Sequence, residues 1–109
     1  MKGKIVLIPF PFTDLTASKR RPALIILERV NDVVVLFISS KTPISLGKHI
    51  ISIKTTHKEF NHTGLKVDSF VYLDKIATLN KNLILGEIGQ IGKKVKSQIN
   101  KNFKKLFRL

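Results

Sequence analysis

The sequence predicts an all-β barrel, built as one small domain, with an amphipathic helix appended at its C-terminal end. Its 109 residues suit a single domain. Short apolar runs of strand length follow one another between turn residues, and helical spacing of apolar residues appears only near the end. We therefore expect one domain over residues 1–109, with the barrel at about 2–92 and the helix at about 93–108.

The first strands are predicted from three apolar runs. Residues 4–12 form a β-rich run whose two prolines must end the strand or place it at a sheet edge. Residues 22–27 and 33–39 are joined by a segment with the Asn31-Asp32 turn signal, which is typical of a hairpin. In both of these runs the residues that face either side of the strand are apolar, which indicates burial on both sides.

Shorter pieces complete the predicted barrel. Residues 49–53 alternate as a strand, whereas 56–65 are polar and are expected to be mostly loop, with room for a short helical turn. Residues 68–73 and 75–79 are expected to be two extended pieces. A further strand over 84–91 contains glycines, which indicate bends or bulges.

The C-terminal segment has the pattern of an amphipathic helix. Its apolar residues are spaced by 4, 4, 3 and 1 and share one face: Val95, Ile99, Phe103, Leu106 and Phe107. The other face carries cations alone: Lys93, Lys94, Lys96, Lys101, Lys104, Lys105 and Arg108. Lysines in the first turn oppose the helix dipole by ~0.3 to 1 kcal/mol each. We expect the apolar face to pack on the barrel; the alternative is an anchor to a membrane surface or to nucleic acid.

The charge of the chain indicates an anionic partner. Twenty Lys and Arg against seven Asp and Glu give a net charge of +13 and a pI near 10.4, which suits a nucleic acid, an anionic membrane or an acidic protein. The absence of cysteine excludes disulfides and thiolate metal sites. No apolar run approaches a signal sequence or the ~20 residues of a membrane span, so we expect a cytoplasmic protein without membrane association.

Two polar segments at strand ends are candidate phosphate-binding sites. Lys19-Arg20-Arg21-Pro22 stands where a loop becomes a strand, and the proline holds Arg21 in an extended conformation. A guanidinium matches a phosphate and stabilises charge that develops on it. Residues 39–43, Ser-Ser-Lys-Thr-Pro, offer hydroxyls to phosphate or ribose. The alternatives are a solvated basic loop and an ordinary turn.

Histidines and acids give weaker signals. His49, His57 and His62, spaced by 8 and 5, do not match a helical pair of metal ligands, so we expect loop histidines and neither a metal nor a cofactor. Asp14 and Asp74 lie near the ends of apolar runs, where each could pair with an arginine or act as a base. For Asp14 a surface ion pair is the favoured role.

Four segments together resemble one family. They are Ile5-Val-Leu-Ile-Pro-Phe-Pro-Phe-Thr-Asp-Leu, Lys19-Arg-Arg-Pro-Ala-Leu-Ile-Ile, Thr63-Gly-Leu-Lys and Ser69-Phe-Val-Tyr-Leu-Asp-Lys-Ile-Ala-Thr-Leu. The chain resembles MazF/PemK-type toxins of type II toxin-antitoxin systems from about Lys2 to Gly92 and on into the terminal helix. The resemblance implies a small SH3-like barrel of the MazF/PemK/CcdB type that forms a homodimer. It also implies a sequence-specific endoribonuclease that cleaves single-stranded messenger RNA without a metal and is neutralised by a cognate antitoxin.

The resemblance also assigns roles to individual residues. Arg21 corresponds to the arginine at the strand start and Ser39 to a hydroxyl that relatives usually supply as threonine. Asp74 corresponds to a catalytic acid and is the candidate base for attack of the ribose 2′-hydroxyl on phosphorus. The expected substrate-binding residues are Lys19, Arg20, Ser40, Lys41 and Thr78.

Two positions depart from the family pattern. Tyr72 stands where some relatives carry an arginine two residues before the acid, and Leu15 lies near a position that some occupy with histidine. Arginine is a poor proton donor, so an electrostatic role is expected of Arg21. The alternatives to an RNase are a module of the same fold that acts on a protein such as gyrase, and a nucleic-acid-binding protein without activity.

Overall fold

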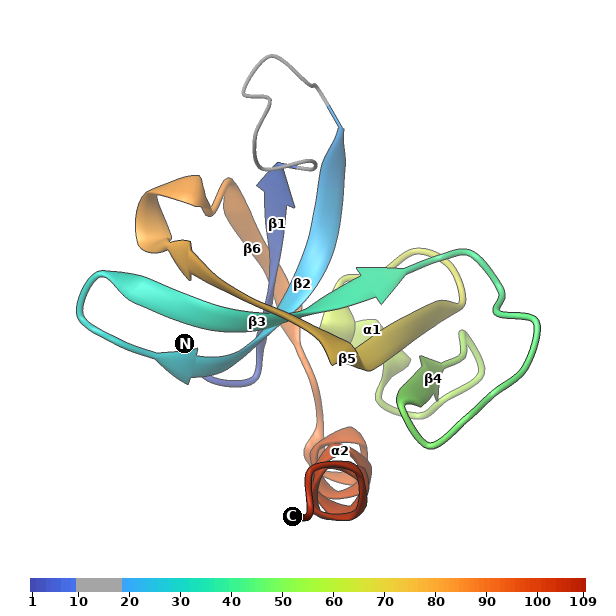
Figure 1. The fold of residues 1–109 in the computed structure, drawn as a ribbon. Helices are drawn as coiled ribbons and strands as arrows, with labels where there is room; N and C mark the ends of the chain where they lie inside the picture. The colour runs from blue at the N-terminus through green and yellow to red at the C-terminus, as the bar shows by residue number, and fades with distance from the viewer. Residues whose placement is uncertain (10–18) are drawn as a thin grey trace.

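The computed structural model describes residues 1–9 and 19–109, which contain nine elements of regular structure. In chain order (Figure 1) these are β1 (Lys4–Pro9), β2 (Arg20–Glu28), β3 (Asp32–Ser39), β4 (Ile50–Ile53), α1 (Phe60–Thr63), β5 (Ser69–Asn80), the 3₁₀ turn η1 (Lys81–Leu83), β6 (Gly86–Gln90) and α2 (Lys93–Leu106). The end of the predicted first strand and the polar loop after it, with Asp14 and Leu15, lie outside the described residues.

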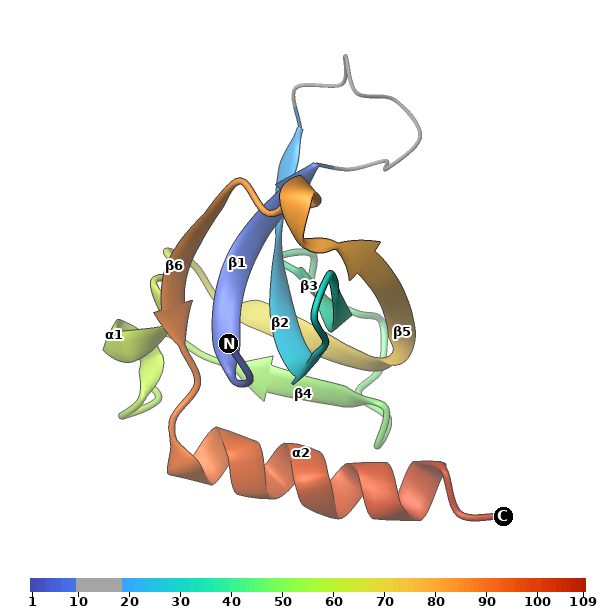
Figure 2. The same cartoon turned by 90° about the vertical axis from the view of Figure 1, so that its left-hand side faces the viewer.

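The six strands form one antiparallel sheet that curls into a half-barrel. Their order is β4-β5-β3-β2-β1-β6, so the two shortest strands form the edges. Figure 2 shows α2 lying across one end of the sheet beside β4, a strand that it contacts. The predicted fold, mainly β with a C-terminal helix, is confirmed.

Apolar side chains form a cluster on each side of the sheet. One contains Leu24 of β2 and Leu36 of β3 with residues from α1 and α2. The other contains Ile25 and Val35, the sequence neighbours of those two leucines. Since successive side chains of a strand point to opposite faces, β2 and β3 are buried on both sides, as predicted. Leu27 is an exception, because it lies at the end of β2 and is 42% exposed.

The strand predictions were wrong in two details. The two extended pieces over 68–73 and 75–79 are one strand of 12 residues, β5. It pairs with β3 on both sides of an irregularity, so the break in its apolar pattern is a bend rather than an end. Ile84 and Leu85 lie outside β6, because η1 comes first, with the Asn80 side chain accepting a hydrogen bond from the Asn82 N–H at 2.8 Å.

The helix α2 packs on the sheet through its apolar face. Val95 and Ile99 are buried and Phe103 is partly buried against the same cluster, whereas Phe107 at the end of the helix is 51% exposed. Within the described residues, no helix is long and apolar enough to cross a membrane.

A distant carboxylate offsets the unfavourable lysines of the first turn of α2. The two Glu59 oxygens accept hydrogen bonds from the backbone N–H groups of Lys94 (2.9 Å) and Val95 (3.1 Å). These bonds hold the pKa of Glu59 below its usual range. The sequence analysis missed this cap because Glu59 lies 35 residues before Lys94.

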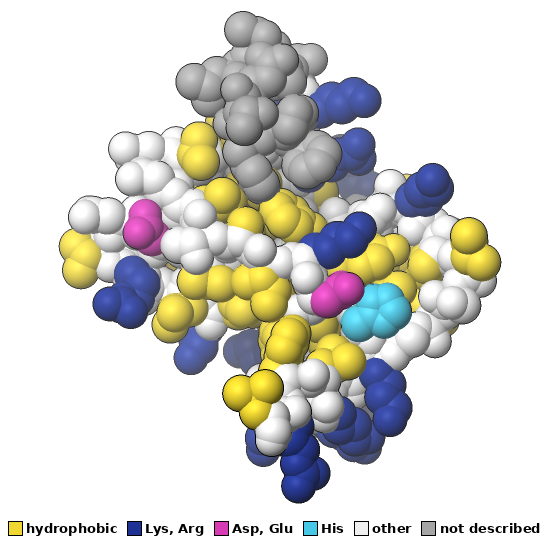
Figure 3. Space-filling view, viewed as in Figure 1, with side chains coloured by type: hydrophobic (Ala, Val, Ile, Leu, Met, Phe, Trp, Pro, Cys, Tyr) yellow, Lys and Arg dark blue, Asp and Glu magenta, His cyan; other side chains and the backbone are white. Residues whose placement is uncertain are grey.

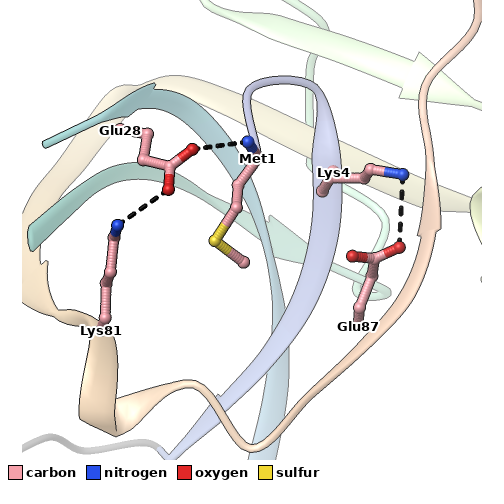
Figure 4. Close-up of polar contacts among 5 residues, drawn as sticks. All are labelled: Met1, Lys4, Glu28, Lys81 and Glu87. Carbon is pink, nitrogen blue, oxygen red and sulfur yellow. Dashed lines mark hydrogen bonds and ion pairs between the residues drawn. The ribbon is translucent and has the colours of Figure 1, made fainter. Parts of the chain in front are cut away.

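A small ion-pair network joins the N-terminus to the end of β2 (Figure 4). The Glu28 carboxylate contacts the Met1 ammonium at 2.7 Å and the Lys81 ammonium at 2.8 Å. These two cations, Lys81 first, lower the pKa of Glu28 to about 2. A separate pair, Lys4 with Glu87 at 3.4 Å, links β1 to β6.

Candidate functional site

A groove of about 640 Å³ opens where β2 begins and β3 ends. The segment between β3 and β4 and the bend of β5 complete its walls. Its polar lining residues are Arg21, Ser39, Ser40, Lys41, Thr42, Ser45, His49, Tyr72 and Lys75. Its apolar lining residues are Phe37, Ile38, Pro43, Ile44 and Ile50. Among the described residues, therefore, the groove has cations and hydroxyls on its walls and no carboxylate.

Strand pairing brings Arg21 and Ser39 together. Arg21 pairs with Ile8 of β1, and Ala23 pairs with Phe37 of β3. This register ends at Ala23 and Phe37, so Arg21 and Ser39 each lie two residues beyond the last pair of the antiparallel strands β2 and β3, and both line the groove. The two residues given central roles by the sequence analysis thus share one wall of the groove.

Ser39 also forms the turn that leaves β3. Its hydroxyl oxygen accepts a hydrogen bond from the Lys41 N–H at 3.1 Å. A hydroxyl that accepts in this way keeps its own hydrogen for donation. Turn formation and phosphate binding, which the sequence analysis treated as alternatives, are therefore compatible at Ser39. Ser40 and Lys41 follow it in the lining of the groove.

The bend in β5 brings a tyrosine and a lysine to the same wall. Leu36 pairs with Ile76 and Ile38 with Val71, so the four residues Tyr72 to Lys75 lie opposite Phe37 alone. A bulge of this kind redirects side chains. The Lys75 ammonium lies 4.5 Å from the centroid of the Tyr72 ring. Lys75 therefore brings a positive charge to the wall of the groove beside Tyr72.

His49 lines the groove, although the sequence analysis expected no special role for it. Its carbonyl oxygen accepts a hydrogen bond from the Leu73 N–H at 2.8 Å, and its ring centroid lies 6.4 Å from that of Tyr72. A Cβ at position 47 would lie 2.6 Å from His49 Nδ1, so Gly47 allows the backbone to pass close to the imidazole. The histidine is held by backbone and by packing.

The other histidines lie elsewhere. His57 Nδ1 accepts the Glu59 N–H at 3.0 Å and so orders the loop before α1, while His62 is an exposed residue of α1. Within residues 1–9 and 19–109, no three His, Asp or Glu side chains gather as metal ligands would.

Four of the predicted site residues do not line the groove. Lys19 and Arg20 are exposed and directly precede Arg21. Asp74 is exposed between the buried Leu73 and the groove residue Lys75. Thr78 pairs with Val34, five residues before Ser39 on β3, or about 16 Å away at ~3.3 Å per residue. The structure therefore brings together Arg21, Ser39, Ser40 and Lys41, but not these four.

The surface around the groove is mixed in character. Figure 3 shows apolar side chains at the centre of this face, with an acidic side chain, a histidine and a basic side chain next to one another beside them. Further basic side chains continue below the histidine. This face thus combines apolar surface and positive charge with an acidic side chain beside the histidine.

Comparison with a family model decides the relationship of the chain. The model of the family described as PemK-like, MazF-like toxin of type II toxin-antitoxin system matches residues 1–107. The chain belongs to this family. A search of curated protein sequences finds no significant match to this PemK/MazF-family toxin.

Solved structures share the fold of this PemK/MazF-family toxin. An endoribonuclease in complex with its cognate antitoxin from a mycobacterial species has a TM-score of 0.75 and 16% identity, covering 100% of this chain and 95% of that one. Toxin MazF-mt6 of Mycobacterium tuberculosis has a TM-score of 0.72 and 18% identity, covering 97% of each chain. MazF from Deinococcus radiodurans has a TM-score of 0.71 and 15% identity, covering 99% of this chain and 96% of that one. At these identities the likeness concerns the fold of the toxin alone.

Proposed function

We propose that this toxin is a metal-independent endoribonuclease that cleaves single-stranded messenger RNA at short sequences in the groove of Arg21 and Ser39. The observation that carries the proposal is that these two residues, each just beyond the last pair of β2 and β3, line one groove with Lys41 and Lys75 and no described carboxylate. Cationic and hydroxyl side chains on such a wall bind the phosphodiester and stabilise the extra negative charge of its transition state. The mycobacterial neighbour of the same fold is described as an endoribonuclease, which supports the activity.

The reaction that this groove suits is attack of the ribose 2′-oxygen on the adjacent phosphorus. The 2′-hydroxyl loses its proton to a base, a bond forms from its oxygen to phosphorus, and the bond from phosphorus to the 5′-oxygen breaks. The 5′-oxygen gains a proton and leaves, so the products carry a 2′,3′-cyclic phosphate and a 5′-hydroxyl. RNA itself supplies the nucleophile, so the protein has to supply charge, orientation and proton transfer.

Each lining residue has a distinct part in this reaction. Arg21 stabilises the charge on the phosphorane-like state with its planar fork of donors. Ser39 donates its hydroxyl hydrogen to a phosphate oxygen. His49 is the lining residue whose side chain has both a donor and an acceptor nitrogen, so it suits the proton transfers. Asp74 does not line the groove but precedes the lining residue Lys75 on β5, and it is the second candidate base. Tyr72 offers a ring on which a base stacks.

We also propose the partners that the family resemblance implies. The neighbour described above is in complex with its cognate antitoxin, so we expect an antitoxin for this chain, and an acidic segment would suit the basic groove. We further expect a homodimer. Light scattering of the purified toxin, alone and with the antitoxin, tests both expectations.

The experiment that tests the activity is cleavage of a single-stranded RNA of mixed sequence in the presence of EDTA. We expect the purified protein to cut this RNA. The Arg21→Ala variant should cleave it about 10²-fold to 10³-fold more slowly, which is the usual cost of removing one donor to a developing charge. Arg29→Ala is the matched control, because Arg29 is exposed in the turn after β2 and does not line the groove. Circular dichroism of both variants verifies the fold.

Three outcomes contradict the proposal. They are cleavage that requires an added metal, full activity of Arg21→Ala, and products without 2′,3′-cyclic phosphate ends. Inhibition of DNA supercoiling by gyrase with no RNA cut would favour a toxin that acts on a protein. Mapping the RNA ends also gives the preferred sequence.

A further inference from the structure

We infer that the outer face of α2 is a second RNA-binding surface, which holds the phosphate backbone of a strand that extends beyond the groove. The inference rests on the proposed function. The surface, called the lysine face below, consists of Lys93, Lys96, Lys101, Lys104 and Lys105, which border a shallow hollow of about 660 Å³. At 14 residues, α2 is about 21 Å long, so the lysine face can follow several nucleotides.

The charge of the lysine face is not neutralised within the described protein. The sequence of α2 contains no acidic residue, and no ion pair among the described residues involves one of its lysines. The acid at the start of the helix, Glu59, directs both carboxylate oxygens to backbone N–H groups. A row of exposed lysines without countercharge attracts a polyanion and releases the counterions condensed on it.

The position of α2 connects the lysine face to the groove. The Asn102 side-chain amide donates a hydrogen bond to the Lys48 carbonyl oxygen at 3.0 Å. Lys48 is exposed and directly precedes His49, which lines the groove. The C-terminal half of α2 thus lies beside one wall of the groove, and Lys48 continues the positive charge between them. A strand that leaves the groove past His49 therefore runs toward the half of α2 that carries Lys101, Lys104 and Lys105.

The packing of α2 favours RNA over a lipid surface. An interfacial helix inserts its apolar face into the membrane. Here that face is already buried in the core, where Val95 is 1% exposed and Ile99 is 3% exposed. Exposed apolar side chains of the helix occur only at its last turn, at Leu106 and beyond. Lysines projecting away from a packed helix are suited to phosphates held at the protein surface.

The test measures binding and cleavage separately, with short and long RNA. Fluorescent 2′-O-methyl RNAs of about 6 and about 30 nucleotides report binding without being cut, and unmodified RNAs of the same sequences report cleavage. The variant is Lys101→Gln with Lys104→Gln and Lys105→Gln. The control, Lys2→Gln with Arg29→Gln and Lys66→Gln, removes the same charge from exposed positions outside α2 and the groove.

We expect the wild type to bind the long RNA more tightly than the short one. The α2 variant should lose about tenfold or more in affinity for the long RNA at low salt. Its slope of log K against log salt should fall by about 2, at ~0.7 per phosphate contact. Its binding and cleavage of the short RNA should match those of the wild type, and the control should keep the wild-type preference for length.

Several results overturn the inference. They are equal binding of the two lengths by the wild type, equal losses in the variant and the control, and an unchanged long-RNA affinity in the variant. The α2 variant could also bind anionic vesicles or an acidic peptide less tightly than the wild type does, while its RNA binding is unchanged. That result would assign the lysine face to the vesicles or the peptide instead. If neither unmodified RNA is cut, the proposed function fails, whereas cleavage of both with no effect of the variant removes this inference alone.

Discussion

The ammonium of Lys75 lies 4.5 Å from the centroid of the Tyr72 ring, and both side chains line the groove. The negative face of an aromatic ring attracts a cation, so Tyr72 holds Lys75 in position without cancelling its charge. In the RNA cleavage proposed above, the pair therefore has two uses: the ring offers a surface for a base, and the ammonium stabilises the phosphate beside it.

Removing the charge of Lys75 should slow cleavage and keep the fold. We expect Lys75→Met to lower kcat/KM for single-stranded RNA by about 10-fold to 10²-fold, because one cation near the reacting phosphate is lost. Lys75→Arg should keep most of the activity. Lys66→Met, at an exposed residue outside the groove, is the matched control. If Lys75→Met cleaves as fast as the wild type, the charge near Tyr72 has no part in the reaction.

Changing His49 tests the proton-transfer role. A positioned acid or base typically contributes 10²-fold to 10⁴-fold to a rate, so we expect His49→Ala to lower kcat by about 10² or more and KM to change little. His62→Ala, at an exposed histidine of α1, should be unaffected. A matching loss in Asp74→Asn with none in His49→Ala would assign the proton transfer to the carboxylate instead.

The sequence predicted what depends on local pattern. The β2–β3 hairpin follows from two apolar runs around a turn, and α2 from apolar spacing at 3.6 residues per turn. Arg21 and Ser39 could be proposed together from the family resemblance. Their positions at a strand start and a strand end then bring them into one groove, because β2 and β3 pair as far as Ala23 and Phe37.

The rest of the site depends on the bend in β5, which the alternating pattern of a regular strand does not predict. In a regular strand Tyr72 and Lys75, three residues apart, point to opposite faces. They share the groove because four residues of β5 lie opposite Phe37 alone. His49 reaches the groove because β4 pairs with β5 next to this bend, with Ile50 opposite Tyr72. A close approach such as that of Gly47 to His49 cannot be read from a local pattern of polar residues.

The ion pairs of Glu28 should make stability depend on pH in acid. Since the pKa of Glu28 falls from 4.5 to about 2 on folding, its contribution is fully present above pH 4.5 and is lost as the pH falls towards 2. We expect Glu28→Gln to lower Tm at pH 7 and to match the wild type near pH 2. Thermal unfolding across this range checks it. A Tm difference that stays constant across the range would contradict the role of the Lys81 and Met1 contacts.

The cap that Glu59 places on α2 gives a second test of long-range structure. Glu59→Gln keeps one acceptor oxygen for the N–H groups of Lys94 and Val95 and loses the negative charge at the positive end of the helix. We expect the free energy of unfolding to fall by about 1 kcal/mol at pH 7, the usual scale for a cap, as measured by urea denaturation.

Two controls distinguish this cap from a general effect of charge. Glu87→Gln removes an exposed partner of Lys4, and such surface pairs contribute ~0 to 1 kcal/mol, so a smaller change is expected. Because the backbone hydrogen bonds lower the pKa of Glu59 below 4.5, its contribution is present above pH 4.5 and disappears as the pH falls below that value. The difference between the wild type and Glu59→Gln should therefore shrink in acid. Equal effects of the two substitutions at pH 7 would show that the Glu59 carboxylate acts as a general charge and not as a cap.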